Sequence, residues 1–394
     1  MKVSTDNKKI EELLSRGVEE VIDKENLRKK LLSGKKLRVK LGIDPTSPNI
    51  HIGRSIPLLK LRDFQELGHQ IVFIIGDFTG VVGDTSDKES ERPMLSKEKV
   101  KENMKDYVKQ AAKIIDMKKC EKHYNSEWLK KLGYWEICGQ ADQFSLAEFI
   151  ARENIRRRLD AQTRVSLREM LYPLMQGYDS VAVKADVEIG GSDQRFNLLT
   201  GRELQAMYKQ EQQDIIMGPL LEGTDGRKMS SSWGNTINLV AEPNDMFGKV
   251  MSIGDDLIVK YFNLATRIPM EQVRGIEQKI KSGVNPRDLK LELAHEIVRM
   301  YHGDKKAAMA REYFVSTFSK KETPTDIPEL KPSAYDIVTI LVESKICASK
   351  GEARRNIEQG GVRVNDVRVE TQNFASLHQG DVVQKGSRFF VKVK

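Results

Sequence analysis

The segment from residue 37 to residue 75 constrains the fold more than any other part of this 394-residue chain. Leu37–Ile43 alternates apolar and basic residues as a strand does, and a turn-forming run of Asp, Pro, Ser and Asn follows it. A helix with apolar residues on one face is then predicted to begin at Asn49 and to stop at Gly68, a residue suited to a helix C-terminus. Gln70–Ile75 is apolar enough for a strand buried on both faces. The segment therefore predicts a βαβ unit in a parallel sheet, with a ligand site at the carboxyl ends of the strands.

The composition excludes several classes of protein. Hydrophobic residues make up 39% of the chain and charged residues 31%, which is ordinary for a globular protein and excludes bulk disorder. No stretch approaches the roughly 18 apolar residues of a membrane span, and the first residues hold no apolar core of a signal peptide. Cys120, Cys138 and Cys347 lie far apart, which suits a reducing cytoplasm and argues against a disulfide framework or a zinc ribbon. We expect a soluble cytoplasmic protein with no membrane contact and no tightly bound metal.

The length predicts two to four domains, at about 100–200 residues each. We expect a parallel-sheet domain over 1–235, a helical domain over 236–322, a Pro-bearing linker over 323–332 and a small α+β domain over 333–394. Residues 331–394 hold 11 Lys and Arg against 7 Asp and Glu, so they supply +4 of the net charge of +8. A basic terminal module is typical of polyanion binding, although charge alone more often reflects a solvated surface.

Apolar periodicity predicts further elements outside the βαβ unit. Residues 1–35 have the pattern of one charged amphipathic helix, and residues 97–117 that of a long exposed helix. A second strand-to-helix passage runs from Asp186–Gly191 into Ser192–Met207, and residues 245–302 are helix-patterned without strands. The predicted fold class is α/β.

The first chemical motif lies where the helix of the βαβ unit begins. Gly42–Thr46 leads there through a loop to His51, Gly53 and Arg54. A helix N-terminus offers free N–H groups and the positive end of the helix dipole, so it suits a phosphate. His51 and Arg54 add donors, and Gly53 lets a ligand approach the backbone. Taken alone, His51 would more often be a helix cap than a catalytic residue.

Two more motifs follow along the chain. Gly226–Ser232 concentrates cations and hydroxyls in one turn, which suits a polyphosphate. Ile189–Gln194 ends a strand, where Asp193 and Gln194 could hold a ribose and a polar substrate group. Each motif is weak alone, because a Gly-rich strand end is usually a tight turn and a Lys-Ser turn is usually a solvated loop.

In this order and spacing the motifs resemble the class I aminoacyl-tRNA synthetases. His51–Arg54 matches the His-Ile-Gly-His signature of that family in three of four places, and Lys228–Ser232 matches Lys-Met-Ser-Lys-Ser in four of five. Tyr172-x-x-x-Gln176-x-x-Asp179, together with Gly190–Gln194, is similar to the tyrosyl branch of the class. Cys347–Asn365 is similar to the alpha-L RNA-binding motif that ends these enzymes.

The resemblance implies both a fold and a function. The fold would be a Rossmann-like catalytic domain, then a helical domain on the anticodon side of the tRNA, then the alpha-L RNA-binding domain. The reaction would join L-tyrosine to ATP, release pyrophosphate with the help of Mg²⁺, and pass the tyrosyl group to the 3′ end of the tRNA for tyrosine. The attacking carboxylate is already an anion, so the reaction needs positioning and charge stabilisation rather than a protein base. A homodimer is implied as well.

The resemblance also assigns roles to residues, with Asp179 accepting the hydrogen of the substrate phenol. The tyrosine-binding residues would be Gly42, Asp84, Tyr172, Gln176, Asp179 and Gln194. The ATP-binding or catalytic residues would be Asp44, Thr46, His51, Gly53, Arg54, Asp193, Lys228, Ser230 and Ser231. Lys40 stands where one branch of the family has a tyrosine that touches the phenol, and its role stays open.

Two departures from the family signatures leave alternatives open. Arg54 replaces the second histidine of the first signature, and Ser231 replaces the second lysine of the other. Arg54 keeps a cation that can bind phosphate bidentately, whereas Ser231 removes one. The pair is either a compensated exchange or the mark of a non-translational RNA-binding paralogue with a weakened ATP site. A tryptophanyl relative would share the fold but has no reason to keep Gln176 and Asp179 as an ammonium-and-phenol pair.

Overall fold

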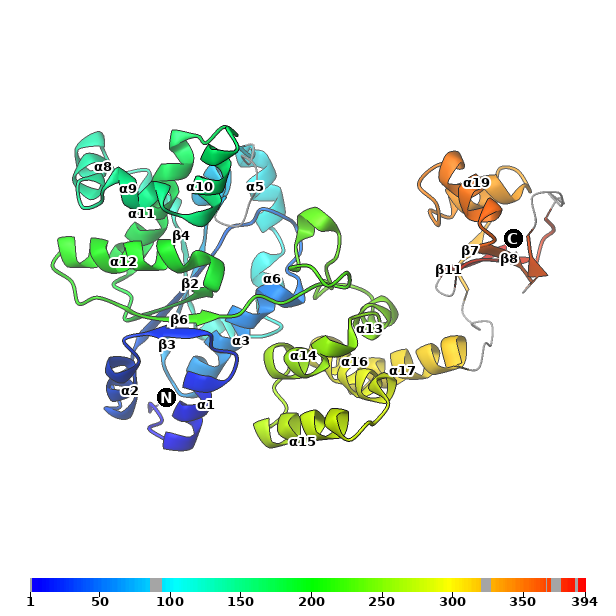
Figure 1. Ribbon diagram of the computed structural model, residues 1–394, viewed down its shortest axis with the longest axis horizontal. Coiled ribbons are helices and arrows are strands. Elements are labelled where there is room, and N and C mark those ends of the chain that lie inside the picture. The colour runs from blue at the N-terminus through cyan, green and yellow to red at the C-terminus, as the bar shows by residue number, and fades with distance from the viewer. Residues whose placement is uncertain (1, 86–93, 320–326, 366, 370–376, 387–388) are drawn as a thin grey trace. The chain divides into compact units, whose positions relative to one another are not determined.

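The computed structural model describes residues 2–85, 94–319, 327–365, 367–369, 377–386 and 389–394 (Figure 1). They divide into two compact units, residues 1–307 and residues 308–394. Among the described residues no helix is both long enough and apolar enough to cross a membrane.

The first unit is built on a sheet whose described strands follow the order β1-β6-β5-β2-β3-β4. These strands are β1 (Glu20–Ile22), β2 (Arg38–Ile43), β3 (Gln70–Ile75), β4 (Glu121–Tyr124), β5 (Val187–Gly191) and β6 (Asp214–Gly218). All neighbours pair in parallel except β1, which runs antiparallel to β6. The order runs outward in both directions from β2 and β5, which makes their carboxyl ends the place where such a sheet binds ligands.

The predicted βαβ unit is confirmed. β2 and β3 pair in parallel from Arg38–Gln70 to Ile43–Ile75, and α3 (Ile52–Glu66) joins them. Five of the six residues of β3 and four of the six residues of β2 are buried, in keeping with their apolar sequences. The second strand-to-helix passage is confirmed too, because β5 leads into α12 (Arg195–Met207).

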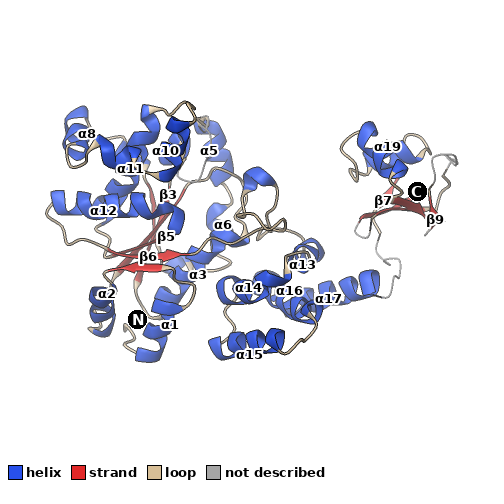
Figure 2. Cartoon of the chain, viewed as in Figure 1, coloured by secondary structure: helices blue, strands red, loops and turns tan. Residues whose placement is uncertain are grey.

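Helices cover the sheet. Figure 1 shows α11 (Leu167–Val183) and α12 on one side of it and α1 (Asn7–Ser15) and α2 (Lys24–Leu32) on the other. Other helices before α12 are α4 (Thr79–Val82), α7 (Ser126–Leu129), α8 (Tyr134–Ala141), α9 (Leu146–Ile150) and α10 (Glu153–Asp160), with α5 and α6 described below. Residues 245–302 are helical as predicted, in α13 (Pro243–Met251), α14 (Ile258–Ala265), α15 (Met270–Lys281) and α16 (Pro286–His302) (Figure 2).

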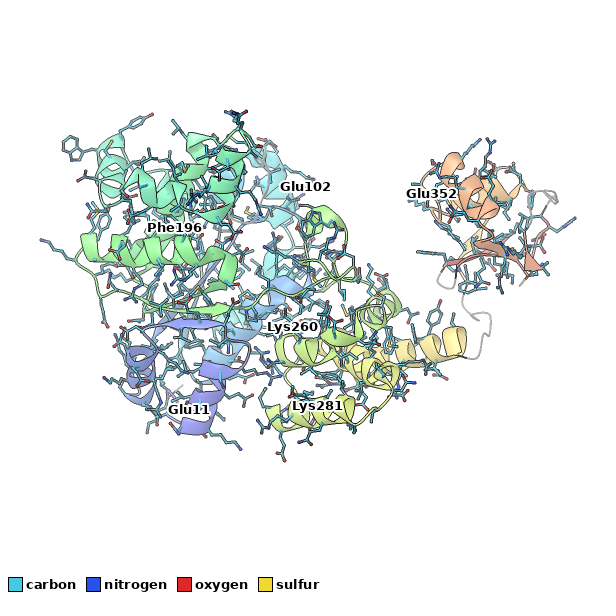
Figure 3. All side chains as sticks on the ribbon, viewed as in Figure 1. Glu11, Glu102, Phe196, Lys260, Lys281 and Glu352 are labelled. Atoms are coloured by element: carbon cyan, nitrogen blue, oxygen red, sulfur yellow. The ribbon has the colours of Figure 1, made fainter. Side chains whose placement is uncertain are left out.

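Two glycines let α11 and α12 cross closely. A Cβ atom added at Gly177 would lie 3.2 Å from the backbone nitrogen of Gly201, so a larger residue would push the helices apart. The ring of Phe196 in α12, labelled in Figure 3, packs edge-on against Phe149 of α9, with ring centroids 5.0 Å apart. The close crossing holds α11, which carries residues that line the cavity described below, against α12.

The single helix predicted over residues 1–35 is wrong. The chain forms α1 (Asn7–Ser15), then β1, then α2 (Lys24–Leu32). Gly17 has a φ of +59° and Asp23 a φ of +60°, and both break the helical path. The segment between them pairs with β6 at the edge of the sheet, and local periodicity does not report such a distant partner.

The long exposed helix predicted over residues 97–117 is also wrong. α5 (Lys97–Met104) and α6 (Tyr107–Ala111) replace it. Tyr107 and Gln110 are buried, and Gln110 accepts from the backbone N–H of Ile50 (2.8 Å) and donates to the carbonyl of Pro48 (2.9 Å). This segment therefore supports the loop that precedes α3.

The described part of the second unit has the expected α+β composition. α18 (Ile337–Glu343) and α19 (Lys350–Glu358) pack on a sheet of order β7-β11-β10-β8-β9, around a core that includes Leu341, Ala353 and Val383. The strands are β7 (Glu329–Leu330), β8 (Val362–Val364), β9 (Val367–Arg368), β10 (Val382–Lys385) and β11 (Phe389–Val393). α17 (Asp304–Ser319) spans the division between the units, and residues 323–326 of the predicted linker lie outside the described residues.

Candidate active site

One cavity of about 520 Å³ opens at the carboxyl ends of β2 and β5. Every residue that the sequence predicts for the site lines it, except Lys40. The volume suits a small-molecule ligand of a few hundred daltons. The structure therefore brings together residues that are spread from Gly42 to Ser231 in the sequence.

Asp179 lies at one end of this cavity and is 3% exposed. Its Oδ1 accepts a hydrogen bond from Trp128 Nε1 (2.7 Å), and its Oδ2 accepts one from Asn125 Nδ2 (3.3 Å). Burial raises the pKa of the Asp179 carboxyl to about 7, and the charge of Lys40 opposes that rise. Sequence reasoning missed Trp128 and Asn125, although their place just after strand β4 is a signal that could have found them.

Asp44 joins the two groups of residues that the sequence assigned separately to tyrosine and ATP. Its Oδ2 accepts from the hydroxyl of Tyr172 (2.9 Å), and its Oδ1 accepts from Thr79 Oγ1 (2.7 Å). A Cβ atom on Gly76 would overlap Asp44 Oδ1, so only glycine leaves room for this carboxylate. Burial raises the pKa of Asp44 to about 6.

A chain of amides connects the other predicted tyrosine-binding residues. Gln194 Nε2 donates to Asp84 Oδ2 (2.7 Å). Asn197 Nδ2 donates to the side-chain oxygens of Gln194 (2.9 Å) and Gln176 (3.1 Å). Asn197 is 1% exposed and was not predicted, yet it orients both amides. Its position three residues after Gln194, on the same face of the chain as α12 begins, was the available signal.

The start of α3 forms the opposite end of the cavity. His51 Nδ1 accepts the backbone N–H of Arg54 (3.3 Å) and so caps the helix, which leaves Nε2 as the protonated nitrogen. Burial lowers the pKa of His51 to about 3, with the charges of Arg54 and Lys228 adding to the effect, so the ring is a neutral donor near pH 7. Arg54 donates to Thr46 Oγ1 (3.0 Å) and to the hydroxyl of Tyr107 (2.8 Å).

The Lys-Met-Ser-Ser-Ser turn closes over the same end. Lys228 Nζ lies 3.0 Å from Asp193 Oδ2, and Ser231 Oγ lies 3.3 Å from Ser47 Oγ. Asn235, which was not predicted, holds the turn by accepting from the backbone N–H of Ser230 (2.8 Å) and donating to the carbonyl of Lys228 (3.0 Å).

The base of this turn is held by the helical part of the unit. Lys260 of α14, labelled in Figure 3, pairs with Glu222 at 2.8 Å, and the hydroxyl of Tyr261 donates to the Glu222 carbonyl at 2.6 Å. Glu222 and Lys228 form a β-bridge, so the helical segment positions the lysine of the turn.

The charges divide the cavity into two chemical halves. Carboxylates and amides line the half around Asp179, whereas the half around α3 presents cations, hydroxyls and a helix N-terminus. Among the described residues there is no group of three or more His, Cys, Asp or Glu that could hold a metal ion. The arrangement suits a polar amino acid beside a polyphosphate.

Residues 32–319 match the family of class I tRNA synthetases (W and Y), and residues 319–390 match the C-terminal domain of tyrosine–tRNA ligases. The chain therefore belongs to the class I aminoacyl-tRNA synthetases. It is 44% identical to the tyrosine–tRNA ligase of Thermotoga maritima over 385 residues, which cover 97% of this chain and 96% of the relative. It is 45% identical to tyrosine–tRNA ligase 2 of Clostridium acetobutylicum, with 97% of each chain covered. Within its class, the chain belongs to the tyrosine–tRNA ligases.

Solved structures share the fold. The tyrosyl-tRNA synthetase of Archaeoglobus fulgidus, solved with L-tyrosine, has a TM-score of 0.62 at 24% identity and covers 77% of this chain and 99% of its own. The truncated mitochondrial enzyme of Aspergillus nidulans has a TM-score of 0.67 at 21% identity and covers 79% and 94%. The predicted family and fold class are confirmed.

Proposed function

We propose that this chain activates L-tyrosine with ATP to tyrosyl-adenylate and pyrophosphate, and then transfers the tyrosyl group to the 3′ end of the tRNA for tyrosine. The observation that carries the proposal is the two-sided cavity, in which a buried carboxylate and a phosphate-binding helix start face the same space. Membership of the tyrosine–tRNA ligases supports it.

In this proposal Asp179 accepts the phenol hydrogen of the substrate. Trp128 and Asn125 already donate to its carboxylate, so its orientation is set before tyrosine arrives. Asp84 and the hydroxyl of Tyr172, with the amides that Asn197 orients, would hold the substrate ammonium. Gly42 lines the pocket, and a Cβ there would meet no atom within 4 Å, so its role is to leave room for the substrate.

At the other end Thr46, His51, Gly53 and Arg54 would bind the phosphates of ATP, and Asp193 would hold its ribose. Lys228, Ser230 and Ser231 would close over them. Mg²⁺ would enter as part of the substrate, bound to the ATP phosphates, because the lining residues at this end are mainly cations and hydroxyls.

The residues need only position the reactants and stabilise charge. The tyrosine carboxylate attacks the α-phosphate as an anion, and negative charge grows on the leaving pyrophosphate. The neutral His51 donates through Nε2, while Arg54 and Lys228 supply positive charge at that end. Arg54 is anchored by Thr46 and Tyr107, so the departure from the family signature keeps a cation in place.

The proposal extends to partners and domains. Exposed apolar side chains cluster in the sequence between residues 134 and 171, with Tyr134 and Trp135 each 89% exposed and Leu167 82% exposed. We propose a homodimer, and these exposed apolar side chains would be available to the contact between its two copies. The proposed domains remain 1–235, 236–322 and 333–394 with a linker over 323–332, and the proposed location is the cytoplasm, in keeping with the free thiols of the three cysteines.

Amino-acid-dependent ATP–pyrophosphate exchange tests the proposal. The purified chain should exchange with tyrosine and not with tryptophan. Exchange with tryptophan would reassign the substrate, and exchange with neither amino acid would identify a non-translational paralogue.

Removing residues 331–394 tests the proposed tRNA role of the basic module. Exchange should stay nearly intact, whereas transfer to tRNA should fall and the salt dependence of tRNA affinity should become shallower, because fewer cations remain to displace counterions. A truncated chain that charges tRNA as well as the full chain does would refute this role.

A further inference from the structure

A buried ion pair lies behind the tyrosine half of the cavity. Lys40 of β2 and Glu188 of β5 are register partners on neighbouring strands, and their side chains meet with Nζ 2.8 Å from Oε1. Lys40 is 0% exposed and Glu188 1% exposed. Glu188 lines the cavity, whereas Lys40 lies outside the lining, so the pair runs from the pocket wall into the protein.

Lys40 also binds the helix that carries the predicted tyrosine-binding residues. Its Nζ donates to the main-chain carbonyl of Gln176 (3.0 Å) and to the hydroxyl of Ser180 (2.8 Å), both on α11. Asp179 lies between these two residues in the sequence, so one ammonium group holds the turn of α11 on which it stands. The charge of Lys40 also favours the ionised form of Asp179, which accepts a phenol hydrogen better than the neutral form.

Glu188 is held in turn by side chains on its other oxygen. Oε2 accepts from Gln213 Nε2 (2.6 Å) and from Ser180 Oγ (2.9 Å), while Oε1 lies 3.5 Å from Gln176 Nε2. A Cβ on Gly201 would come within 2.7 Å of Gln213 Nε2. The absence of a side chain at Gly201 therefore leaves room for this hydrogen-bond network.

A buried ion pair is a poor way to gain stability, because the cost of removing two charges from water is comparable to their attraction. An apolar pair would fill the same space at no such cost. Lys40 makes two contacts on α11 and one with Glu188 on the pocket wall. These contacts indicate that the charges serve to position the pocket rather than to stabilise the fold.

We infer that the Lys40–Glu188 pair positions Gln176 and Asp179 for the substrate and thereby sets the selectivity for tyrosine over phenylalanine. The inference rests on the proposed function. Lys40 and Glu188 are positioning residues that act through Gln176 and Asp179. Lys40 stands where one branch of the family has a tyrosine that touches the phenol, but in this role it needs no contact with the phenol.

The test compares Lys40→Met, Glu188→Gln and the double variant with the unaltered full chain. We expect Lys40→Met to raise KM for tyrosine about tenfold or more and to lower the tyrosine-to-phenylalanine ratio of kcat/KM by a similar factor. KM for ATP should change by no more than about twofold, since the described contacts of the pair lie on the tyrosine side of the cavity. The double variant should recover the thermal stability that Lys40→Met loses, but not the selectivity.

Lys30→Met is the matched control. Lys30 is 10% exposed in its side chain and pairs with the buried Asp214 at 3.0 Å, and neither residue lines the cavity. This variant should lower the melting temperature and leave both KM values and the amino-acid ratio unchanged.

Each outcome bears on the inference. If Lys40→Met does not fold, Glu188→Gln keeps the size of the side chain and should still lower the tyrosine-to-phenylalanine ratio. An unchanged ratio in the folded variants, or equal changes in the KM values for tyrosine and ATP, would overturn the inference. A failure of the unaltered chain to exchange with tyrosine would instead refute the proposed function, so the two failures are distinguishable.

Discussion

The two halves of the cavity are built from different kinds of structure. The deepest part of the tyrosine half is formed by residues of α11 and the sheet, where Asp179, Tyr172, Glu188 and Lys40 are all buried. The phosphate half depends on loops and the start of α3, and the side chains of Lys228 and Asp193 are 26% and 19% exposed. The surroundings of Asp179 are therefore buried and cross-linked by hydrogen bonds, whereas Lys228 and Asp193 at the other end are partly open to solvent.

This difference teaches where selectivity and turnover are expected to reside. A buried acceptor rejects an analogue that lacks a hydroxyl, because the acceptor is then left without a hydrogen bond and water cannot reach it. Tyrosyl-tRNA synthetases are themselves the established example of this effect, and they reject phenylalanine by about 10⁵ without editing. The phosphate half must admit ATP and release pyrophosphate, which suits a turn that a few hydrogen bonds hold.

Asp179→Asn should give the largest effect and should fall on the tyrosine half alone. The amide keeps the shape but loses the charge that accepts the phenol hydrogen, a bond worth about 1.5–3 kcal/mol. We expect the tyrosine-to-phenylalanine ratio of kcat/KM to fall by about 10- to 100-fold, with KM for ATP nearly unchanged. Exchange kinetics with both amino acids measure this, and unaltered relative use of the two would contradict the assignment of Asp179.

The pH dependence of KM for tyrosine should show the next largest effect, and it should arise from the tyrosine half of the cavity. The pKa of Asp179 is raised to about 7 from 3.8, so the carboxyl becomes a full acceptor only as pH rises through that value. Lys40 favours its ionisation and Glu188 opposes it. We expect KM for tyrosine to fall several-fold from about pH 6 to about pH 8, and this slope should disappear in Asp179→Asn.

The same shift carries a stability signature. Between about pH 4 and about pH 7 the folded protein holds a proton that the unfolded chain has already lost, so the raised pKa favours folding most at low pH. This contribution is lost as pH rises through the folded value. Across that range the melting temperature of the ligand-free chain should therefore fall relative to that of Asp179→Asn. Parallel pH profiles for the two proteins would mean that another group titrates.

Much of the fold could be predicted because local patterns agree with it. The run from Leu37 to Ile75 holds its own strand, turn and helix signals, and the structure confirms all of them. The errors lie where a distant partner decides the local structure. β1 forms because it pairs with β6 at the edge of the sheet. α6 is a separate helix from α5, and its residues Tyr107 and Gln110 are buried beside the site.

The site residues were predictable under the same condition, namely that a local sequence pattern identified them. Residues carried by the signature motifs converge on the cavity, whereas Asn125, Trp128, Asn197 and Asn235 belong to no motif that the sequence displayed. Their roles come from hydrogen bonds to residues that are distant in sequence or hidden in loops. The partner of Lys40 could not be inferred either, since Glu188 lies 148 positions later and meets it only through the parallel pairing of β2 with β5.

The smallest expected effect concerns coupling within the phosphate half, between Arg54 and Ser231. Arg54 is anchored on Thr46, and Ser231 lies 3.3 Å from the next residue, Ser47, so the two departures from the family signatures meet on one dipeptide. Arg54→His should slow adenylate formation, because it removes a fixed cation and two of its hydrogen bonds. Ser231→Lys alone should help little, since it adds a cation next to an arginine that already serves the site.

The double change restores both signatures of the family, so it should recover more activity than the two single effects predict by addition. Ser231 is exposed and its hydroxyl makes a long contact with Ser47, which places the coupling near the lower end of the usual range, at about 0.5–1 kcal/mol. Pre-steady-state adenylate formation in all four proteins measures it, with the tyrosine-to-phenylalanine ratio as the internal control that should stay constant throughout. Strict additivity would mean that the two departures arose independently, and a change in the amino-acid ratio would mean that the two halves of the cavity are not separable in the way their structures indicate.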